Sequence, residues 1–596
     1  MSPYHRDLLD PIPALVLRVR ENLNLISSYV PDRLVAVLYA YLPTRTTLET
    51  TRNLLLAAAS LAPSPEGPYL APGPGSAHAV LDAFMSYSIE FVFWPDFAGN
   101  CSHPNTFSDN LLQNLGNLQG VRPYVRVGGN TQDYALYNES LFTAVHGIYD
   151  YNRSRDYPTT VQIGPSFFES YSTFNDTKFT HGFNLALGAI RPEGWQTLID
   201  TVPLACRAIG QDNLDRWEYG NEPDLYSVSA QGPVRPLTWN AETYVAQWLN
   251  GTRRIREALE AACPAMLDDN LYSYAAPSNG GVYNPLQAED QWAAGLNSDG
   301  NVGTFSTHNY ISGAETPGVT LQETLMNHHT TTHSVDAHVR TYRDIVRRFG
   351  DVPPHILGEH NSLYHQGKPG LSNSFGAALW GVDFNLYAAS VGIKRVHMHM
   401  GTDYRYTSWQ PINTETTVAG TKPPYYGNIA VAAMLSPIHP SLAASDLPSS
   451  LLPSRRPKVS MAHIPLPTRR AAAYAAYLDD AFARLMVINL QAYNSTVNGT
   501  GTVPDPDAPE RPVFRYTFEV PLQRGEARVQ RLYANGSDAV SGIAWDGWSY
   551  NLELDEGRPV RLRNVTVGEK LPVRDGVVEV DVQASQAVLL SFVGET

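Results

Sequence analysis

The sequence predicts an α/β fold: a (β/α)8 TIM barrel followed by a C-terminal antiparallel β-sandwich domain. Two patterns carry this prediction. From about residue 87, short apolar strand patterns alternate with helical patterns, and after about residue 469 strand patterns continue without helices between them. The length of 596 residues is also too great for one compact domain. We therefore expect at least two domains.

Eight short segments rich in apolar and aromatic residues are the candidate barrel strands. They are residues 88–93, 124–127, 159–163, 214–219, 272–276, 303–307, 355–358 and 394–400. Helical stretches fall between them, at residues 242–262, 334–349 and 374–391. In the second stretch Val335, Val339 and Tyr342 recur on one helix face. Eight strands that alternate with helices indicate a closed parallel barrel.

The domain boundaries follow from shifts in composition. A Pro- and Ser-rich stretch at residues 437–468 is the predicted linker between the barrel (86–436) and the sandwich (469–596). Residues 56–85 hold a candidate strand that joins the sandwich, and residues 1–55 are interpreted as an N-terminal extension, a leader or a mispredicted start. The predicted sandwich strands are residues 472–478, 485–490, 515–521, 528–533, 560–562 and 577–592.

Charge and cysteine content narrow the function. The net charge of −15 argues against nucleic acid as a partner and against tight docking on long polyanions. The three cysteines, Cys101, Cys206 and Cys263, allow one disulfide and leave one thiol over. Aromatic residues make up 10 % of the chain, a content that suits sugar binding.

Sequons for N-glycosylation are more frequent than we expect from this composition. The acceptor residues are Asn100, Asn138, Asn152, Asn175, Asn250, Asn494, Asn498, Asn535 and Asn564. They are spread over the chain and favour a secreted, N-glycosylated eukaryotic protein, the alternative being a chance excess. No apolar run of the sequence has the length of a membrane span, so we expect no membrane insertion. The sequence does not indicate an oligomeric state.

Two strand ends carry the candidate chemistry. The run Trp217-Glu218-Tyr219-Gly220-Asn221-Glu222-Pro223-Asp224 is apolar and aromatic until it changes abruptly to Gly-Asn-Glu-Pro. A second run, Ile356-Leu357-Gly358-Glu359-His360-Asn361, has the same form. Strand ends carry the active sites of (β/α)8 barrels, and a pair of carboxylates is the machinery that cleaves a glycosidic bond. The alternative for each residue is an ordinary Glu in a salt bridge, but two matching contexts favour a functional pair.

Three motifs make the resemblance to a known family definite. They are Ser88-Ile89-Glu90-Phe91, Arg126-Val127-Gly128-Gly129-Asn130-Thr131-Gln132-Asp133 and Gly358-Glu359-His360-Asn361. With Asn-Glu-Pro after the fourth strand, they resemble glycoside hydrolase family 79, which contains β-glucuronidases and heparanase. The likeness runs from about residue 86 to the C-terminus. It implies that Glu222 is the acid/base and Glu359 the nucleophile.

The resemblance also implies substrate contacts. These are Asp133, Glu90, Tyr310, Tyr364, His399 and Tyr406, and Asn221 is added because its amide lies beside the acid. Phenols and backbone N–H groups near Arg405 would receive a substrate carboxylate. Simpler interpretations exist: Asp133 braces a loop, Tyr310 and Tyr364 border the core, and Arg126 forms a structural ion pair. His397 and His399 face the same way on one strand, but no further ligands with metal-type spacing follow, so we predict neither metal nor cofactor.

Together these observations predict a secreted, retaining, exo-acting β-glucuronidase. It would remove terminal β-D-glucuronate, with or without a 4-O-methyl group, from glycans. One alternative is a relative that acts on a neutral sugar, such as a xylosidase or an arabinofuranosidase. Another is a non-catalytic relative that only binds glycans, against which the presence of both carboxylates counts.

Overall fold

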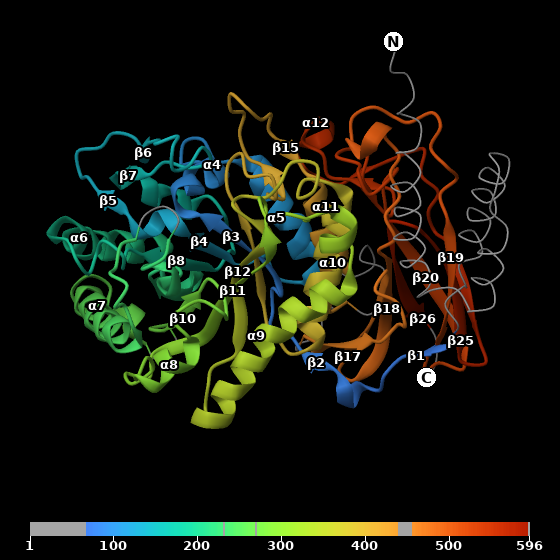
Figure 1. The fold of residues 1–596 in the computed structure, drawn as a ribbon, viewed down its shortest axis with the longest axis horizontal. Helices are drawn as coiled ribbons and strands as arrows, with labels where there is room; N and C mark the ends of the chain where they lie inside the picture. The colour runs from blue at the N-terminus through green and yellow to red at the C-terminus, as the bar shows by residue number, and fades with distance from the viewer. Residues whose placement is uncertain (1–66, 230–232, 269–270, 439–455, 594–596) are drawn as a thin grey trace, which may run out of the picture. The chain divides into compact units, whose positions relative to one another are not determined.

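A closed barrel of eight parallel strands forms the first part of the fold (Figure 1). The computed structural model describes residues 67–229, 233–268, 271–438 and 456–593, so the expectation for residues 1–55 lies outside the described residues. Each strand pairs with the next along the chain, and the last closes on the first. The strands are β3 (Met85–Glu90), β4 (Val125–Gly128), β8 (Phe179–Phe183), β9 (Leu214–Tyr219), β10 (Tyr274–Asn279), β11 (Val302–Gly313), β12 (His355–Tyr364) and β13 (Val396–Met400). The (β/α)8 prediction is confirmed.

Helices follow most of these strands and cover the barrel. They are α5 (Thr106–Gln119), α6 (Pro192–Ile209), α7 (Ala241–Ala262), α8 (Ala288–Ala293), α9 (His328–Phe349), α10 (Phe375–Ser390) and α11 (Pro423–Met434), with the short α4 (Trp94–Ala98) after β3. Every residue of α10 is buried, because this helix is mostly apolar and lies between the barrel and the sandwich (Figure 1). A disulfide joins Cys206 of α6 to Cys263, the residue that follows α7.

One barrel strand was predicted wrongly. Residues 159–163 do form a strand, β7 (Thr160–Ile163), but it belongs to a separate three-stranded sheet with β5 (Ala135–Tyr137) and β6 (Val145–Ile148). The third strand of the barrel is β8 instead. The alternation of Val161 and Ile163 is the same in any half-buried strand, so it does not reveal which sheet the strand joins.

The C-terminal part is a β-sandwich built from one antiparallel-rich sheet of 13 strands. Its strands are β1 (Tyr69–Leu70), β2 (His78–Ala79), β16 (Val459–Ile464), β17 (Ala471–Leu478), β18 (Ala481–Asn489), β19 (Val513–Glu519), β20 (Arg524–Tyr533), β21 (Ala544–Trp545), β22 (Trp548–Ser549), β23 (Val560–Arg561), β24 (Lys570–Arg574), β25 (Val577–Gln583) and β26 (Gln586–Val593). The short β14 (Trp409–Gln410) and β15 (Gly420–Thr421) pair separately, and α12 (Leu552–Asp555) is a single turn.

Two predictions for this part are corrected. Residues 577–592 were expected to form one strand, but they form two, β25 and β26, which turn at Ala584 and Ser585. The expected linker contains a strand, β16, which pairs with β17 and with β2. Both β1 and β2 lie in the segment 56–85, and both pair with this sheet.

Strand β17 joins the two parts because it is buried on both faces. Ala473, Ala475 and Tyr477 pack into the interior of the sandwich, while Ala472 and Tyr474 belong to the barrel core. The Tyr474 hydroxyl donates a hydrogen bond of 2.7 Å to Asp383 Oδ1 on α10. The sandwich is therefore packed directly on the barrel helices.

Candidate active site

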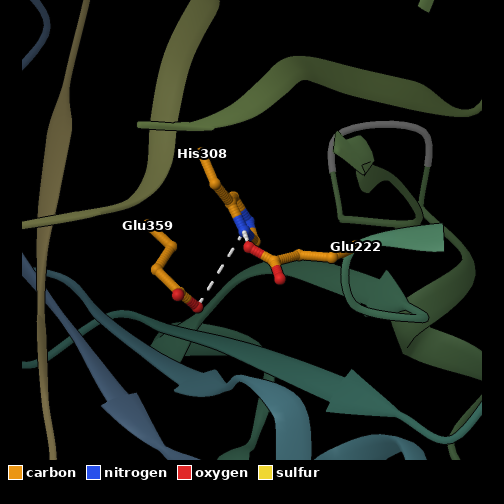
Figure 2. A group of neighbouring side chains, drawn as sticks. All are labelled: Glu222, His308 and Glu359. Carbon is orange, nitrogen blue, oxygen red and sulfur yellow. Dashed lines mark hydrogen bonds and ion pairs between the residues drawn. The ribbon is translucent and has the colours of Figure 1, made fainter. Parts of the chain in front are cut away.

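The two predicted carboxylates meet at the ends of the barrel strands (Figure 2). Glu222 follows β9, His308 lies in β11 and Glu359 lies in β12. His308 Nδ1 is 3.0 Å from Glu222 Oε1 and 3.9 Å from Glu359 Oε2. One carboxylate oxygen of Glu222 lies within 4.8 Å of one oxygen of Glu359. Residues 137 positions apart are thus brought into one cluster by the barrel.

Glu359 is surrounded by donors and positive charge. Arg126 Nη1 donates a hydrogen bond of 2.6 Å to its Oε2, and the Tyr310 hydroxyl donates one of 2.8 Å to its Oε1. His399 Nδ1 lies 3.5 Å from Oε2. Burial alone would raise the pKa of Glu359, but His399, Arg126 and the Tyr310 hydrogen bond outweigh burial and hold that pKa well below its usual range. Glu359 is therefore ionised.

Glu222 has the opposite surroundings. Burial, and then the charge of Glu359, raise the pKa of Glu222 well above its usual range. Its neighbour His308 does not offset this by carrying a charge, because burial lowers the His308 pKa to about 4. A Cβ placed at Gly280 would lie 2.9 Å from the Glu222 carboxyl carbon, so this close approach requires glycine. Glu222 is therefore held protonated near neutral pH.

Arg126 connects several polar side chains of the site by hydrogen bonds. Its side chain is buried and also donates to Glu218 Oε2 at 2.9 Å and to Asn221 Oδ1 at 2.7 Å. Alternate residues of each strand face the barrel interior, which places Arg126 of β4, Glu218 of β9 and Ser88 of β3 together. Arg126 thus forms the structural ion pair considered in the sequence analysis and also fixes Glu359 directly.

Glu90 lies at the end of β3 and contacts His399, a neighbour of Glu359. Its Oε1 accepts hydrogen bonds from the backbone N–H (2.9 Å) and hydroxyl (2.6 Å) of Thr131. Its Oε2 faces His399 Nε2 and the Tyr404 hydroxyl, both at 3.3 Å. Burial lowers the pKa of His399, but Glu359 and Glu90 outweigh burial and raise that pKa above its usual value, so the imidazole between the two carboxylates favours its cationic form.

Asp133 braces the loop behind Glu222. Its Oδ1 accepts from the backbone N–H groups of Leu185 (2.9 Å) and Ala186 (3.1 Å). Its Oδ2 accepts from the Asn221 N–H at 2.9 Å and from the Tyr226 hydroxyl at 2.5 Å. Burial raises the Asp133 pKa to about 6 against these bonds. Because four donors occupy the carboxylate, Asp133 positions Asn221 and is not free to bind a sugar, contrary to the predicted contact.

The predicted tyrosines differ in position. Tyr406 is buried, and its ring centroid lies 6.0 Å from that of Tyr310. Tyr364 is 45 % exposed, and its ring packs over Gly313 and beside His365. Tyr406 thus joins the group around Glu359, and Tyr364 lies at the rim.

The Arg405 side chain is committed to protein groups. Its guanidinium pairs with Asp156 and donates to the backbone carbonyls of His365 and Gly367. Its backbone N–H donates to Gln366 O at 2.8 Å. The expected backbone donors near Arg405 therefore do not include the N–H of Arg405 itself.

His308 was missed by the sequence analysis, although it stands two residues before Tyr310 on the same strand. Residues two apart on a strand share a face, so Tyr310 and His308 both point into the barrel. This two-residue spacing from Tyr310 is the sequence feature from which His308 could have been predicted. His308, Glu222 and Glu359 together have the spacing of a cation site, and within the described residues they are the single group of this kind. The Arg126 guanidinium already neutralises Glu359, which favours an acid and nucleophile pair over a metal centre.

Comparison with known proteins agrees with this geometry. The family model for the glycosyl hydrolase family 79 C-terminal beta domain matches residues 473–589. A β-glucuronidase of Neurospora crassa is 56 % identical over 538 residues, which cover 87 % of this chain and 95 % of that protein. A β-glucuronidase of Aspergillus niger is 50 % identical over 524 residues, covering 87 % and 92 %.

The chain belongs to glycoside hydrolase family 79. A solved structure shares the fold of this family 79 protein. It is the 4-O-α-L-rhamnosyl-β-D-glucuronidase of Fusarium oxysporum 12S, with a TM-score of 0.67 and 23 % identity, covering 88 % of this chain and 100 % of that one.

Proposed function

We propose that this protein is a retaining, exo-acting β-glucuronidase that removes terminal β-D-glucuronate, with or without a 4-O-methyl group, from glycans. One observation carries the proposal: two carboxylates with oxygens within 4.8 Å of each other have opposite protonation preferences. Retaining glycosidases hold their carboxyl groups about 5–5.5 Å apart, whereas inverting enzymes leave about 6.5–9.5 Å for a water molecule. The close relatives named β-glucuronidase support the choice of sugar.

The mechanism follows from the two environments. Glu359, held ionised by Arg126 and Tyr310, attacks the anomeric carbon while Glu222 donates its proton to the glycosidic oxygen. The aglycone leaves as an alcohol, and a glucuronyl ester of Glu359 remains. Glu222, now ionised, takes a proton from water, which attacks the anomeric carbon and releases glucuronate. Two inversions give net retention.

For the substrate carboxylate, we propose recognition by phenol and backbone donors. Tyr406 is buried beside Tyr310, and Tyr364 lies at the rim. The Arg405 guanidinium, the cation of this loop, is already paired with Asp156. The net charge of −15 also favours removal of single terminal residues over docking on a long polyanion.

We further propose that the protein is secreted and N-glycosylated. Eight of the nine sequon asparagines are exposed, and Asn138 is half-buried. The Cys206–Cys263 disulfide suits an oxidising compartment. Among the described residues, no helix has the length and apolarity to cross a membrane. Peptide mapping of the protein from its native host, with and without enzymatic deglycosylation, tests the modification.

Release assays test the activity. Aryl β-glucuronide should be hydrolysed, and aryl β-xyloside and α-arabinofuranoside should be left largely intact. Glycans capped by glucuronate, with and without 4-O-methylation, then define the natural substrate. Faster cleavage of the xyloside or the arabinofuranoside would replace this proposal with a neutral-sugar enzyme.

A further inference from the structure

The loop that carries Glu222 has an unusual backbone. Glu222 adopts the left-handed conformation, with φ 50° and ψ 53°, which side-chain-bearing residues rarely occupy. Its N–H donates a hydrogen bond of 3.0 Å to Ser278 O, and Ser278 is itself left-handed, with φ 56°. Such conformations persist only where the surroundings fix them. Other contacts must therefore hold the Glu222 loop against the loop that follows β10.

Asp224 connects the Glu222 loop to the loop that follows β10. It lies two residues after Glu222, and its side chain is fully buried. Its Oδ1 accepts from the Gly280 N–H at 2.8 Å, and its Oδ2 accepts from Asn284 Nδ2 at 2.6 Å. Gly280 is the residue whose missing side chain lets the Glu222 carboxyl approach. One carboxylate thus joins the acid/base loop to the backbone that lines the acid.

We propose that Asp224 is a positioning residue: its carboxylate, bound to Gly280 and Asn284, fixes the Glu222 carboxyl at the glycosidic oxygen. This inference rests on the proposed function and deepens it. The reaction requires the acid to lie within hydrogen-bond distance of the leaving oxygen. A displacement of about 1 Å at such a group costs roughly 10²-fold in rate, so a rigid loop is needed.

The charge of Asp224 has a second effect. Burial, and then the charge of Glu222, raise the pKa of Asp224 to about 7. Coupling between two acids is mutual, so an ionised Asp224 keeps Glu222 protonated to higher pH. Besides Glu222, the titratable groups that face Asp224 are His308 of β11 and Tyr244 of α7. Those that face Glu222 are Glu359, Arg126, His399, Glu90, His308 and Tyr310.

Asp224→Asn tests the connection. Asparagine cannot accept both hydrogen bonds while Asn284 also presents its amide as donor. For a glucuronide with a poor leaving group, such as an alkyl aglycone, kcat/KM should fall about 10- to 100-fold. For a dinitrophenyl glucuronide, which needs no proton, kcat/KM should change little. The basic limb of the pH profile should move to lower pH, because the neighbouring charge is lost.

The double variant Asp224→Asn/Asn284→Asp restores the connection with its partners exchanged. The amide introduced at position 224 accepts from the Gly280 N–H through its oxygen. Its nitrogen donates to the carboxylate introduced at position 284, so both hydrogen bonds return. Activity on the poor leaving group should recover most of the loss. A folded double variant that remains as slow as the single variant would overturn the proposal.

Asp538→Asn is the matched control. Asp538 is also buried and accepts hydrogen bonds from Ser495 and Thr496, but it lies in the sandwich domain. This variant should lower Tm without changing the ratio of kcat/KM between the two leaving groups. If Asp224→Asn also lowered Tm and slowed both substrates equally, or altered neither, Asp224 would be structural only. Wild-type protein that is inactive on every glucuronide would reject the proposed function instead.

Discussion

Glu222 and Glu359 have oxygens within 4.8 Å of each other, yet the chain supports the two carboxylates in different ways. Glu359 is part of strand β12 and accepts hydrogen bonds from Tyr310 of the adjacent strand β11 and from Arg126 of β4. Glu222 lies in a left-handed loop beyond β9, faces a neutral His308, and has two acids nearby, Glu359 and Asp224. The strand position favours a fixed, ionised carboxylate, and the loop position favours a protonated one.

This contrast shows that role is assigned by surroundings and not by residue type. Both residues are glutamates whose unperturbed pKa values are equal, and both are largely buried. Burial raises both pKa values, but only Glu359 has cationic partners strong enough to reverse the effect. A pair with pKa values pushed apart supplies an acid and a nucleophile at one pH.

The largest predicted effect comes from removing the ionised member. Glu359→Gln should abolish turnover of every glucuronide, including activated aryl substrates, because no covalent step remains. The loss in kcat should be on the order of 10⁵–10⁶, as for other covalent nucleophiles. Stopped assays with a dinitrophenyl glucuronide measure it. Near-normal turnover of that substrate by Glu359→Gln would show that the two roles are assigned wrongly.

Removing the protonated member should have a selective effect. Glu222→Gln should lower kcat/KM for alkyl or glycan substrates by about 10²–10⁴-fold, because their leaving groups need a proton. Dinitrophenyl glucuronide should keep most of its kcat/KM. A plot of log kcat/KM against leaving-group pKa measures this, and its slope should be steeper than in the wild type. An unchanged slope would contradict the acid role.

Tyr310→Phe should reduce the difference in pKa between Glu222 and Glu359 without removing either carboxylate. The variant loses the hydroxyl that donates to Glu359, so the Glu359 pKa rises. Because the nucleophile must be ionised, the acidic limb of the kcat/KM profile should move to higher pH. Loss of a hydrogen bond to a charged group costs about 1.5–3 kcal/mol, or roughly 10- to 100-fold in kcat/KM. Tyr474→Phe, at the junction with the sandwich, is the control and should leave the acidic limb unchanged.

The smallest predicted effect concerns the choice of sugar. Tyr406→Phe should lower kcat/KM for aryl glucuronide more than for aryl glucoside, because a donor to the carboxylate is lost while the ring remains. A site whose buried donors are left unpaired discriminates strongly, so a difference of about 10-fold is expected. Tyr364→Phe should give a smaller difference, because its ring is 45 % exposed. Equal losses on both sugars would show that these tyrosines only shape the pocket.

Local patterns were sufficient to predict the carboxylate pair and the architecture. Strand β9 ends with the aromatic residues Trp217 and Tyr219 and is followed abruptly by Gly220-Asn221-Glu222-Pro223, so its end could be found without the fold. The third barrel strand was not found, because Phe179-Thr180-His181-Gly182-Phe183 contains polar residues that the barrel interior buries. Strand β16 was missed because prolines surround it on both sides.

The contacts within the site could not be predicted, because they depend on which strands pair in the barrel and the sequence does not specify that pairing. His308 approaches Glu222 only because β11 adjoins β12 and β10 in the closed barrel. Asp133 was expected at the sugar, but its four hydrogen bonds come from Leu185, Ala186, Asn221 and Tyr226, which follow other strands. The motifs identified which side chains lie near the site. The fold determines which of these side chains are free to bind a substrate.

The most direct test of the account is to trap the covalent intermediate and locate it. Incubation with a 2-deoxy-2-fluoro-β-glucuronyl fluoride should inactivate the protein, because the fluorine slows both steps and the fluoride leaves without help from an acid. Peptide mass spectrometry should place one fluoroglucuronyl group on Glu359 and none on Glu222. A label on Glu222, or hydrolysis of a glucuronide to the α-anomer with no label at all, would contradict the assignment.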